Sequence, residues 1–170
     1  MVSSLDGFIA RNDNTVSWLE SPPDAYEKGV PEHAAEEADG VVGCFVLGSR
    51  TYEHALELGW PYGDIPTVVV TSRKLASARA SVEFYSGDLR RLVNERLAPR
   101  FGSIWVVGGA LLCQNFLALG LVDEIRLTVA PVLLGKGLRL FSDSGAESRW
   151  KLKDVTAYKT GFVELLYAAR

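Results

Sequence analysis

Three short apolar runs, each stopped by glycine or hydroxyl residues, constrain the fold of this chain more than any other feature. They are rich in β-branched and aromatic residues and read CFVL at Cys44–Leu47, TVVVT at Thr67–Thr71 and IWVV at Ile104–Val107. Runs of this kind are typical of strands buried in a parallel sheet. They therefore predict three buried strands.

The segments around these strands have helical character. Leu89–Leu97 follows Asp88, a good N-cap, and carries its apolar side chains on one face. Ala110–Leu119 is nearly all apolar, Thr51–Leu58 follows the first strand directly, and Pro31–Ala38 is rich in Glu and Ala. Strands and helices in this order predict a mostly parallel sheet with helices on both faces.

The last third of the chain changes character. Glu124–Val132 alternates between apolar and polar residues, and Trp150–Tyr158 and Phe162–Ala168 alternate around Thr160 and Gly161. This pattern is typical of antiparallel strands joined in a hairpin. The predicted fold class is therefore α/β, with a mostly parallel centre and an antiparallel C-terminal edge.

Length and charge limit the classes of function. The chain has 170 residues without an internal repeat, low-complexity tract or linker, which predicts a single domain over residues 1–170. Its net charge is −3 and it has no basic patch, so we expect no nucleic-acid partner. It lacks both an apolar stretch of about 20 residues and a signal-peptide pattern, so we expect a cytoplasmic protein that does not bind membranes.

The cysteines and histidines do not suggest a metal. Cys44 and Cys113 lie in apolar surroundings, and His33 and His54 are far apart in the sequence. We therefore expect two reduced core thiols and no metal site.

Polar residues gather where each buried strand ends. The three segments are Gly48–Thr51, Thr71–Lys74 and Gly108–Ala110. Glycine permits a tight turn, hydroxyls and free N–H groups at a helix start hold phosphate, and arginine or lysine pairs with it. Because ligands of open α/β sheets bind outside the carboxyl ends of the strands, we expect the three segments to converge on one crevice.

Each of these segments alone has an ordinary structural explanation. Gly48–Thr51 fits a plain helix cap, Thr71–Lys74 a solvated turn, and Gly108–Gly109 a packing device. The G-x-G-x-x-G pattern of dinucleotide-binding folds is absent. The hypothesis of a phosphate site therefore depends on finding three such segments at successive strand ends.

Four segments also carry a recognisable pattern. They are Ser4–Ala10 (SLDGFIA), Leu47–Glu53 (LGSRTYE), Val106–Gly109 (VVGG) and Leu121–Phe141 (LVDEIRLTVAPVLLGKGLRLF). In these segments, and in their order, the chain resembles the dihydrofolate reductase superfamily, most closely the branch of the reductase domain of bacterial riboflavin biosynthesis. The resemblance spans nearly the whole chain, and P-x-L-L-G-x-G-x-x-L-F is its most specific part.

The resemblance implies a three-layer fold that binds NADPH at the three strand ends. It also implies a cis peptide between Gly108 and Gly109. Only Met1–Ser3 stand where the family has a longer central strand, so this strand is short or the chain begins late. The implied cofactor-binding residues are Gly48, Ser49, Arg50, Thr51, Thr71, Ser72, Arg73, Val107, Gly108, Gly109, Ala110, Leu111 and Leu112.

The sequence departs from the family on the cofactor side. Many relatives have a basic residue where this chain has Ser49, so Arg50, Arg73 or Lys74 would have to supply the charge that selects NADPH over NADH.

On the substrate side, relatives carry an acidic residue on the helix before the glycine turn. Counting back from Gly48 favours Glu32, although Glu36 and Glu37 lie on the same helix and all three also fit a solvated face. Asp6 and Trp18 lie in the loop that closes over nicotinamide in relatives, and each also fits a turn or the core. Thr128 matches a strand hydroxyl that assists the substrate. The candidate catalytic residues are thus Glu32, Asp6 and Thr128, and the candidate substrate-binding residues are Leu5, Asp6 and Trp18.

The resemblance implies an NADPH-dependent reductase of a small heterocyclic or ribosylamino substrate, most like the 5-amino-6-(5-phosphoribosylamino)uracil reductase of riboflavin biosynthesis. His54 and Ala55 stand near where those reductases carry an aspartate for the ribityl chain, which argues against assigning that substrate outright. Dihydrofolate reduction and a catalytically inactive NADPH-binding module remain as alternatives. Because relatives pair through the C-terminal strands, we expect a homodimer.

Overall fold

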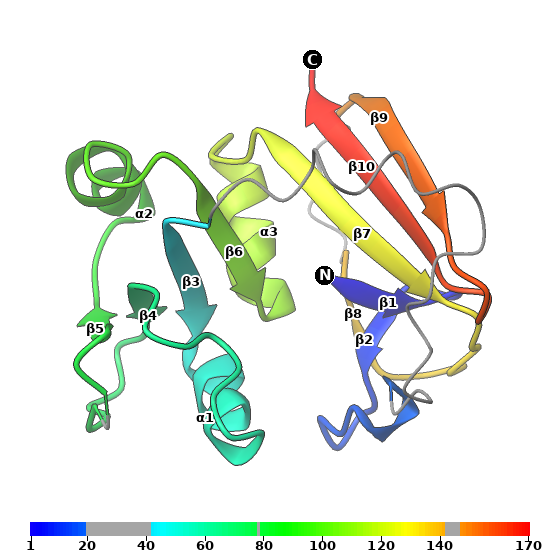
Figure 1. Ribbon diagram of the computed structural model, residues 1–170, viewed down its shortest axis with the longest axis horizontal. Coiled ribbons are helices and arrows are strands. Elements are labelled where there is room, and N and C mark those ends of the chain that lie inside the picture. Colours follow the sequence, from blue (N-terminus) through cyan, green and yellow to red (C-terminus); the bar gives the residue numbers. More distant parts are fainter. Residues whose placement is uncertain (20–41, 78, 142–146) are drawn as a thin grey trace. The chain divides into compact units, whose positions relative to one another are not determined.

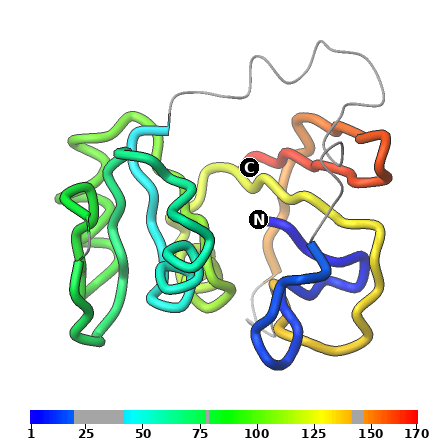
Figure 2. The backbone as a smooth tube through the Cα atoms, turned by 60° about the horizontal axis from the view of Figure 1, so that its bottom comes forward, coloured from blue at the N-terminus to red at the C-terminus, as the bar shows by residue number. Residues whose placement is uncertain are grey.

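The computed structural model describes residues 1–19, 42–77, 79–141 and 147–170. The chain divides into two compact units. Asp39–Leu121 form the central unit, while Met1–Ala38 and Val122–Arg170 together form the terminal unit. In Figure 2 the blue N-terminal segment and the yellow-to-red C-terminal segments run together within the terminal unit.

The central unit contains a four-stranded sheet in the order β5-β4-β3-β6, in which every pairing is parallel (Figure 1). Its strands are β3 (Cys44–Gly48), β4 (Thr67–Val70), β5 (Val82–Tyr85) and β6 (Ile104–Gly108). The three predicted strands are confirmed. The sequence did not predict β5, because this edge strand carries the exposed Glu83 in place of a continuous apolar run.

Helices cover both faces of this parallel sheet. They are α1 (Ser49–Glu57), α2 (Leu89–Arg91), which continues as the π-helical segment η2 (Leu92–Leu97), and α3 (Ala110–Ala118). The side chain of Asp88 accepts a hydrogen bond from the N–H group of Arg91 at 2.9 Å, so the predicted cap is confirmed. The side chain of Arg96 on η2 pairs with Glu83 and lies over the ring of Tyr85, on the face opposite to α1.

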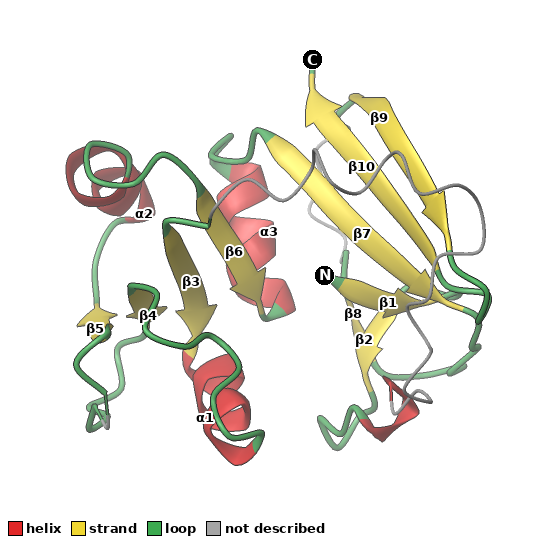
Figure 3. Ribbon diagram, in the orientation of Figure 1, coloured by secondary structure: helices red, strands yellow, loops and turns green. Residues whose placement is uncertain are grey.

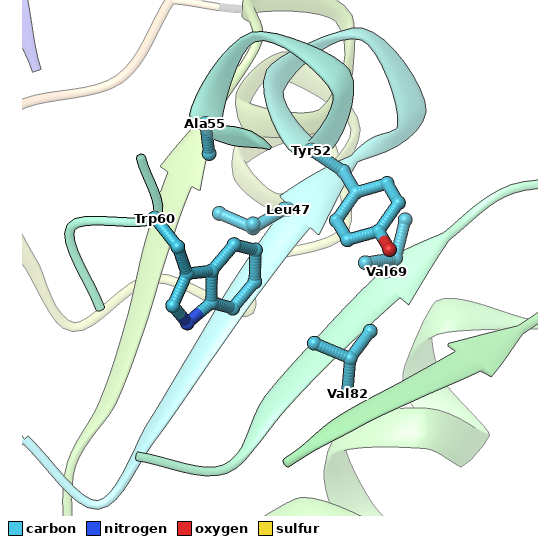
Figure 4. Packing of buried hydrophobic residues seen from close by; sticks show 6 residues of the cluster. All are labelled: Leu47, Tyr52, Ala55, Trp60, Val69 and Val82. Carbon is cyan, nitrogen blue, oxygen red and sulfur yellow. The ribbon is translucent and has the colours of Figure 1, made fainter. Parts of the chain in front are cut away.

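The packing of α1 against its face of the sheet forms a hydrophobic cluster (Figure 4). Tyr52 and Ala55 project from α1 onto Leu47 and Val69, and Trp60 closes the cluster beside them. These side chains are at most 6% exposed. The apolar residues that follow the glycine turn thus fix the direction in which α1 leaves the sheet.

The terminal unit contains a second four-stranded sheet in the order β1-β7-β10-β9 (Figure 3). β1 runs parallel to β7, and the other pairings are antiparallel. A small antiparallel pair, β2 with β8, and a short 3-10 helix, η1, complete the unit. The elements are β1 (Val2–Ser4), β2 (Phe8–Ala10), η1 (Ser17–Leu19), β7 (Glu124–Ala130), β8 (Leu138–Arg139), β9 (Trp150–Ala157) and β10 (Val163–Ala169).

These observations confirm the α/β class and the antiparallel C-terminal hairpin. The first strand, Val2–Ser4, joins the sheet beside β7. The Gly108–Gly109 peptide is cis, as the resemblance implied. Cys44 and Cys113 are free thiols, and burial raises the pKa of Cys44 to about 11. No helix within the described ranges is long and apolar enough to cross a membrane.

The two faces of the terminal sheet differ in polarity, because successive side chains of a strand point to opposite faces. The strand register places three rows of apolar side chains on one face. These rows are Ile125, Tyr167 and Leu152; Leu127, Leu165 and Val155; and Val129, Val163 and Ala157. The opposite face carries Arg126, Thr128 and Glu164. Leu152 and Val155 are both 49% exposed, so the apolar face is only partly covered.

Candidate functional site

The three predicted segments converge at the carboxyl edge of the parallel sheet in the central unit. Gly48 at the end of β3 lies in register with Val70 at the end of β4, and the preceding Leu47 lies in register with Gly108 at the end of β6. A β-bulge between Val46 and Leu47 adjusts the register beside β6. The three segments therefore share one edge of the sheet, while the crevice expected between them stays a prediction.

Two helices start at this edge without a side-chain cap. Gly48 is the N-cap of α1 and Gly109 that of α3, and no described side chain accepts a hydrogen bond from the first N–H groups of either helix. By contrast, the start of α2 is capped by the side chain of Asp88. Uncapped N–H groups at the positive end of a helix are suited to binding an anion.

The glycines keep the space between the two helix starts open. A β-carbon at Gly48 would lie 3.5 Å from the carbonyl oxygen of Gly108 and 3.6 Å from the nitrogen of Gly109. A β-carbon at Gly109 would lie 3.7 Å from Oγ1 of Thr51. A side chain longer than a β-carbon at either position would therefore occupy space between the two helix starts.

The side chains after Gly109 show how this turn could hold a cofactor. Ala110 and Leu112 are buried, and Val107 packs against the α1 cluster, so these three residues can offer only backbone groups. The side chain of Leu111 is 72% exposed in the first turn of α3. It is the one apolar side chain of this turn that a flat ring could rest against.

In the cationic segment after β4, Arg73 was expected to bind phosphate, but its side chain is paired with a carboxylate. Nη1 and Nη2 of Arg73 bind the two carboxylate oxygens of Glu53 on α1, at 2.9 and 2.6 Å. The N–H group of Arg73 also donates to Oγ1 of Thr71 at 3.0 Å. Arg73 is therefore already paired, whereas Arg50, Ser72 and Lys74 present exposed side chains at the same edge.

Asp6 lies in the terminal unit and has a clear structural partner. Its carboxylate accepts hydrogen bonds from the hydroxyl of Ser4 at 2.6 Å and from the N–H groups of Leu134 and Gly135 at 3.1 and 2.6 Å. These bonds, led by that from Ser4, lower its pKa from 3.8 to about 2. Asp6 is thus a carboxylate at neutral pH, and its contacts agree with the turn that the sequence left open as the alternative, while its catalytic role stays a prediction.

The segments Ser4–Ala10 and Leu121–Phe141, which both carry the resemblance, are joined by the hydrogen bonds of Asp6 and by two backbone hydrogen bonds. The N–H group of Leu5 donates to the carbonyl of Val132 at 2.8 Å, and that of Leu140 donates to the carbonyl of Gly7 at 3.0 Å. The S-L-D-G and P-x-L-L-G-x-G patterns are therefore parts of one loop structure. The Leu5 side chain itself is 61% exposed, so it is available to a ligand.

Trp18, a candidate of the terminal unit, packs in an apolar cluster. Trp18 packs with Val2 and Tyr158 against Ala130 and Phe162, and its buried Nε1 has no hydrogen-bond partner among the described residues. This position agrees with a core aromatic, the alternative that the sequence left open. Glu32 lies outside the described residues.

Thr128 has a neighbour that sequence reasoning missed. Thr128 is 8% exposed, and its hydroxyl donates to the carboxylate of Glu164 at 3.4 Å. Nε of Arg126 lies 4.0 Å from the other oxygen of Glu164. The signal was present in the sequence, because Glu164 is the one charged residue in the otherwise apolar run FVELLYA.

Comparison with known proteins identifies one family and two relatives of similar length. A model of the RibD C-terminal domain family matches residues 1–163. The uncharacterized protein YwjB of Bacillus subtilis (strain 168) is 32% identical over 152 residues, which are 88% of this chain and 84% of YwjB. YyaP of the same organism is 28% identical over 173 residues, covering 96% of this chain and 89% of YyaP.

Solved structures share the fold at lower sequence identity. A Shewanella sp. PV-4 protein assigned to riboflavin biosynthesis superposes with a TM-score of 0.80 at 24% identity and covers 100% of this chain and 96% of its own. A Thermotoga maritima protein, a diaminohydroxyphosphoribosylaminopyrimidine deaminase and 5-amino-6-(5-phosphoribosylamino)uracil reductase, gives a TM-score of 0.65 at 15% identity. The match to the Thermotoga protein covers 99% of this chain and 55% of the other.

Proposed function

The chain belongs to the RibD C-terminal domain family, and from this premise we propose that it is a reductase that uses NADPH to reduce a small heterocyclic or ribosylamino substrate. The observation that carries the proposal is the pair of uncapped helix starts, α1 and α3, which meet at one sheet edge around Gly48 and Gly109. This arrangement supports a pyrophosphate site on physical grounds that are independent of the family match.

The residues of the central unit have separate tasks in this proposal. The first N–H groups of α1 and α3 bind the phosphates, with the hydroxyls of Ser49 and Thr51 beside them. Arg50 and Lys74 attract the 2′-phosphate. Leu111 offers an apolar surface to a ring of the cofactor. When bound, NADPH supplies a hydride, and the protein contributes position and the exclusion of water.

The polar face of the terminal sheet offers groups suited to the substrate. Reduction of a C=N bond needs a group that donates a proton or polarises the nitrogen. Glu164, with Thr128 and Arg126 beside it, provides a carboxylate, a hydroxyl and a cation on one face. This set suits a substrate that carries ring N–H groups and an anionic substituent.

The proposed substrate class follows the activity of the Thermotoga relative, which reduces a ribosylamino-uracil, as its name states. In this chain Ala55 is buried in the α1 cluster, and His54 lies 3.4 Å from the carboxylate of Glu57. The region that follows the glycine turn therefore offers no carboxylate at the position where pathway reductases carry one. We accordingly propose the substrate class rather than the pathway intermediate itself.

The test is a steady-state assay of NADPH oxidation with aminouracil-type and folate-type substrates, combined with calorimetric titration of NADPH. We expect NADPH binding and oxidation with an aminouracil-type substrate. Oxidation with folate-type substrates alone would instead identify a dihydrofolate reductase. Binding without oxidation of any substrate would identify an inactive binding module, and absence of binding would refute the proposal.

A further inference from the structure

The Glu53–Arg73 ion pair has the geometry of a specific contact. Both carboxylate oxygens bind both terminal nitrogens of the guanidinium, at 2.6 and 2.9 Å. Bidentate pairing of this type is the strongest that arginine forms with a carboxylate. The side chains remain 53% and 42% exposed for Arg73 and Glu53, so a ligand can reach the pair from solvent.

The pair lies at the edge that the proposed cofactor would occupy. Arg73 comes directly after β4, and its backbone is fixed by the hydrogen bond to Oγ1 of Thr71. Glu53 comes from the second turn of α1, the helix that starts at Gly48. Arg73, through its hydrogen bond, is the main cause of the lowered pKa of Glu53, and the charge of Arg50 contributes. Glu53 therefore interacts with two of the three cations expected to select NADPH.

The charges at this edge have opposite effects on the two forms of the cofactor. A 2′-phosphate gains from each free cation and is repelled by a carboxylate. A 2′-hydroxyl can instead donate a hydrogen bond to a carboxylate, which is how acidic residues select NADH in dinucleotide-binding folds. While Glu53 holds Arg73, the pair adds no net charge at this edge of the sheet.

We propose that Glu53 determines the cofactor specificity of this protein by neutralising Arg73, so that NADPH is preferred over NADH less strongly than the three cations alone would allow. This inference rests on the proposed function, because it places the adenosine ribose at the edge that carries Arg73. It predicts that removal of the negative charge at position 53 increases selectivity for the 2′-phosphate.

The experiment measures binding of adenosine 2′,5′-bisphosphate and of adenosine 5′-monophosphate to wild type and to Glu53→Gln by calorimetry, followed by NADPH and NADH. We expect the ratio of the two affinities to shift toward the 2′-phosphate by roughly fivefold in Glu53→Gln, the effect of about 1 kcal/mol at an exposed site. The shift should shrink as ionic strength rises. Arg73→Ala should lower the ratio more in the Glu53→Gln background than in wild type.

Glu95→Gln is the matched control, because it breaks another exposed Glu–Arg pair of the same unit, with Arg91 on α2. It should leave the ratio unchanged. A ratio that stays constant or falls in Glu53→Gln would overturn the inference while leaving the proposed function in place. If wild type binds neither nucleotide nor either cofactor, the proposed function fails and the inference fails with it.

Discussion

The carboxylate of Asp6 accepts a hydrogen bond from the N–H group of Gly135 at 2.6 Å and thereby joins two segments that lie far apart in the sequence. Leu134 donates to the same carboxylate at 3.1 Å. Because an amide cannot replace a carboxylate that accepts from two backbone N–H groups and a hydroxyl, we expect Asp6→Asn to lower the melting temperature by several degrees. Asp13→Asn is the control and should cost less, since Asp13 accepts hydrogen bonds from Thr15, only two residues away in the sequence.

The same contact predicts a pH dependence of stability. The pKa of Asp6 falls from 3.8 to about 2 on folding, so its contribution to stability is complete above about pH 4 and is lost as the pH falls toward 2. Denaturant titrations at a series of pH values should therefore show wild type losing more stability between pH 4 and pH 2 than Asp6→Asn. Equal slopes in that range would contradict the role assigned to Asp6.

The space around Gly109 predicts how cofactor binding responds to a larger side chain. A β-carbon at Gly109 meets only Oγ1 of Thr51 at 3.7 Å, so Gly109→Val should fold. Its branched side chain would cover the N–H groups at the start of α3, and we expect NADPH affinity to fall by about a hundredfold or more, the loss of two charge-assisted hydrogen bonds. Gly102→Ala, at the opposite end of β6, has open space around it and is the control.

Arg50 and Lys74 should account for most of the attraction to a 2′-phosphate in wild type, because Arg73 is held by Glu53. We expect each alanine replacement to weaken NADPH binding by roughly fivefold at low salt and to affect NADH little. Calorimetric titration of both cofactors measures this difference. Equal losses for NADPH and NADH would show that these cations do not contact the 2′-phosphate.

Thr128 and Glu164 should affect turnover without affecting cofactor affinity, because every proposed cofactor-binding residue lies in the central unit. We expect Glu164→Gln to lower kcat/KM by roughly tenfold or more, the effect of one hydrogen bond to a charged group, with Thr128→Val in the same direction. Glu124→Gln, an exposed residue at the start of β7, is the control. A Glu164→Gln enzyme with full turnover would remove this face from the substrate site.

The apolar face of the terminal sheet leads us to propose a homodimer. Leu152 and Val155 are 49% exposed on β9, an edge strand, and the rows behind them are apolar across three strands. Light scattering should give twice the 18.6 kDa mass of the chain. Val155→Lys should shift the protein toward a single chain, whereas Lys153→Glu on the same strand should not. A monomeric wild type would contradict the proposal.

The sequence predicted the parallel strands and the glycine turns well, because buried strands and helix starts depend on local composition. It did not predict β5, whose four residues include an exposed charge, or β2 and β8, which are three and two residues long, and a strand at β1 was expected only from the resemblance. Strands this short are stabilised by pairing with another strand. β1, for example, pairs with β7, which lies more than a hundred residues away in the sequence. No local pattern carries that information.

Contacts between different elements of the candidate site were likewise not predictable from local sequence patterns. Residue types at the strand ends indicated phosphate binding, but they could not show that Arg73 is already bound to Glu53, since that contact joins two different elements. Likewise, the S-L-D-G pattern suggested a reactive Asp6, while its pairing with the N–H groups of Leu134 and Gly135 is a tertiary contact. Sequence patterns named the candidate residues, and the structure showed which of them contact one another.

The division of the chain also has a consequence for synthesis on the ribosome. Every strand of the parallel sheet lies between Cys44 and Gly108, so the central unit can complete its hydrogen bonding while the chain is still being made. β1 must wait for its partner β7, and β7 for β10, which ends at Ala169. Val2–Ser4 thus cannot pair until β7 has been made, and until then they remain an unpaired strand that a nascent-chain chaperone can bind.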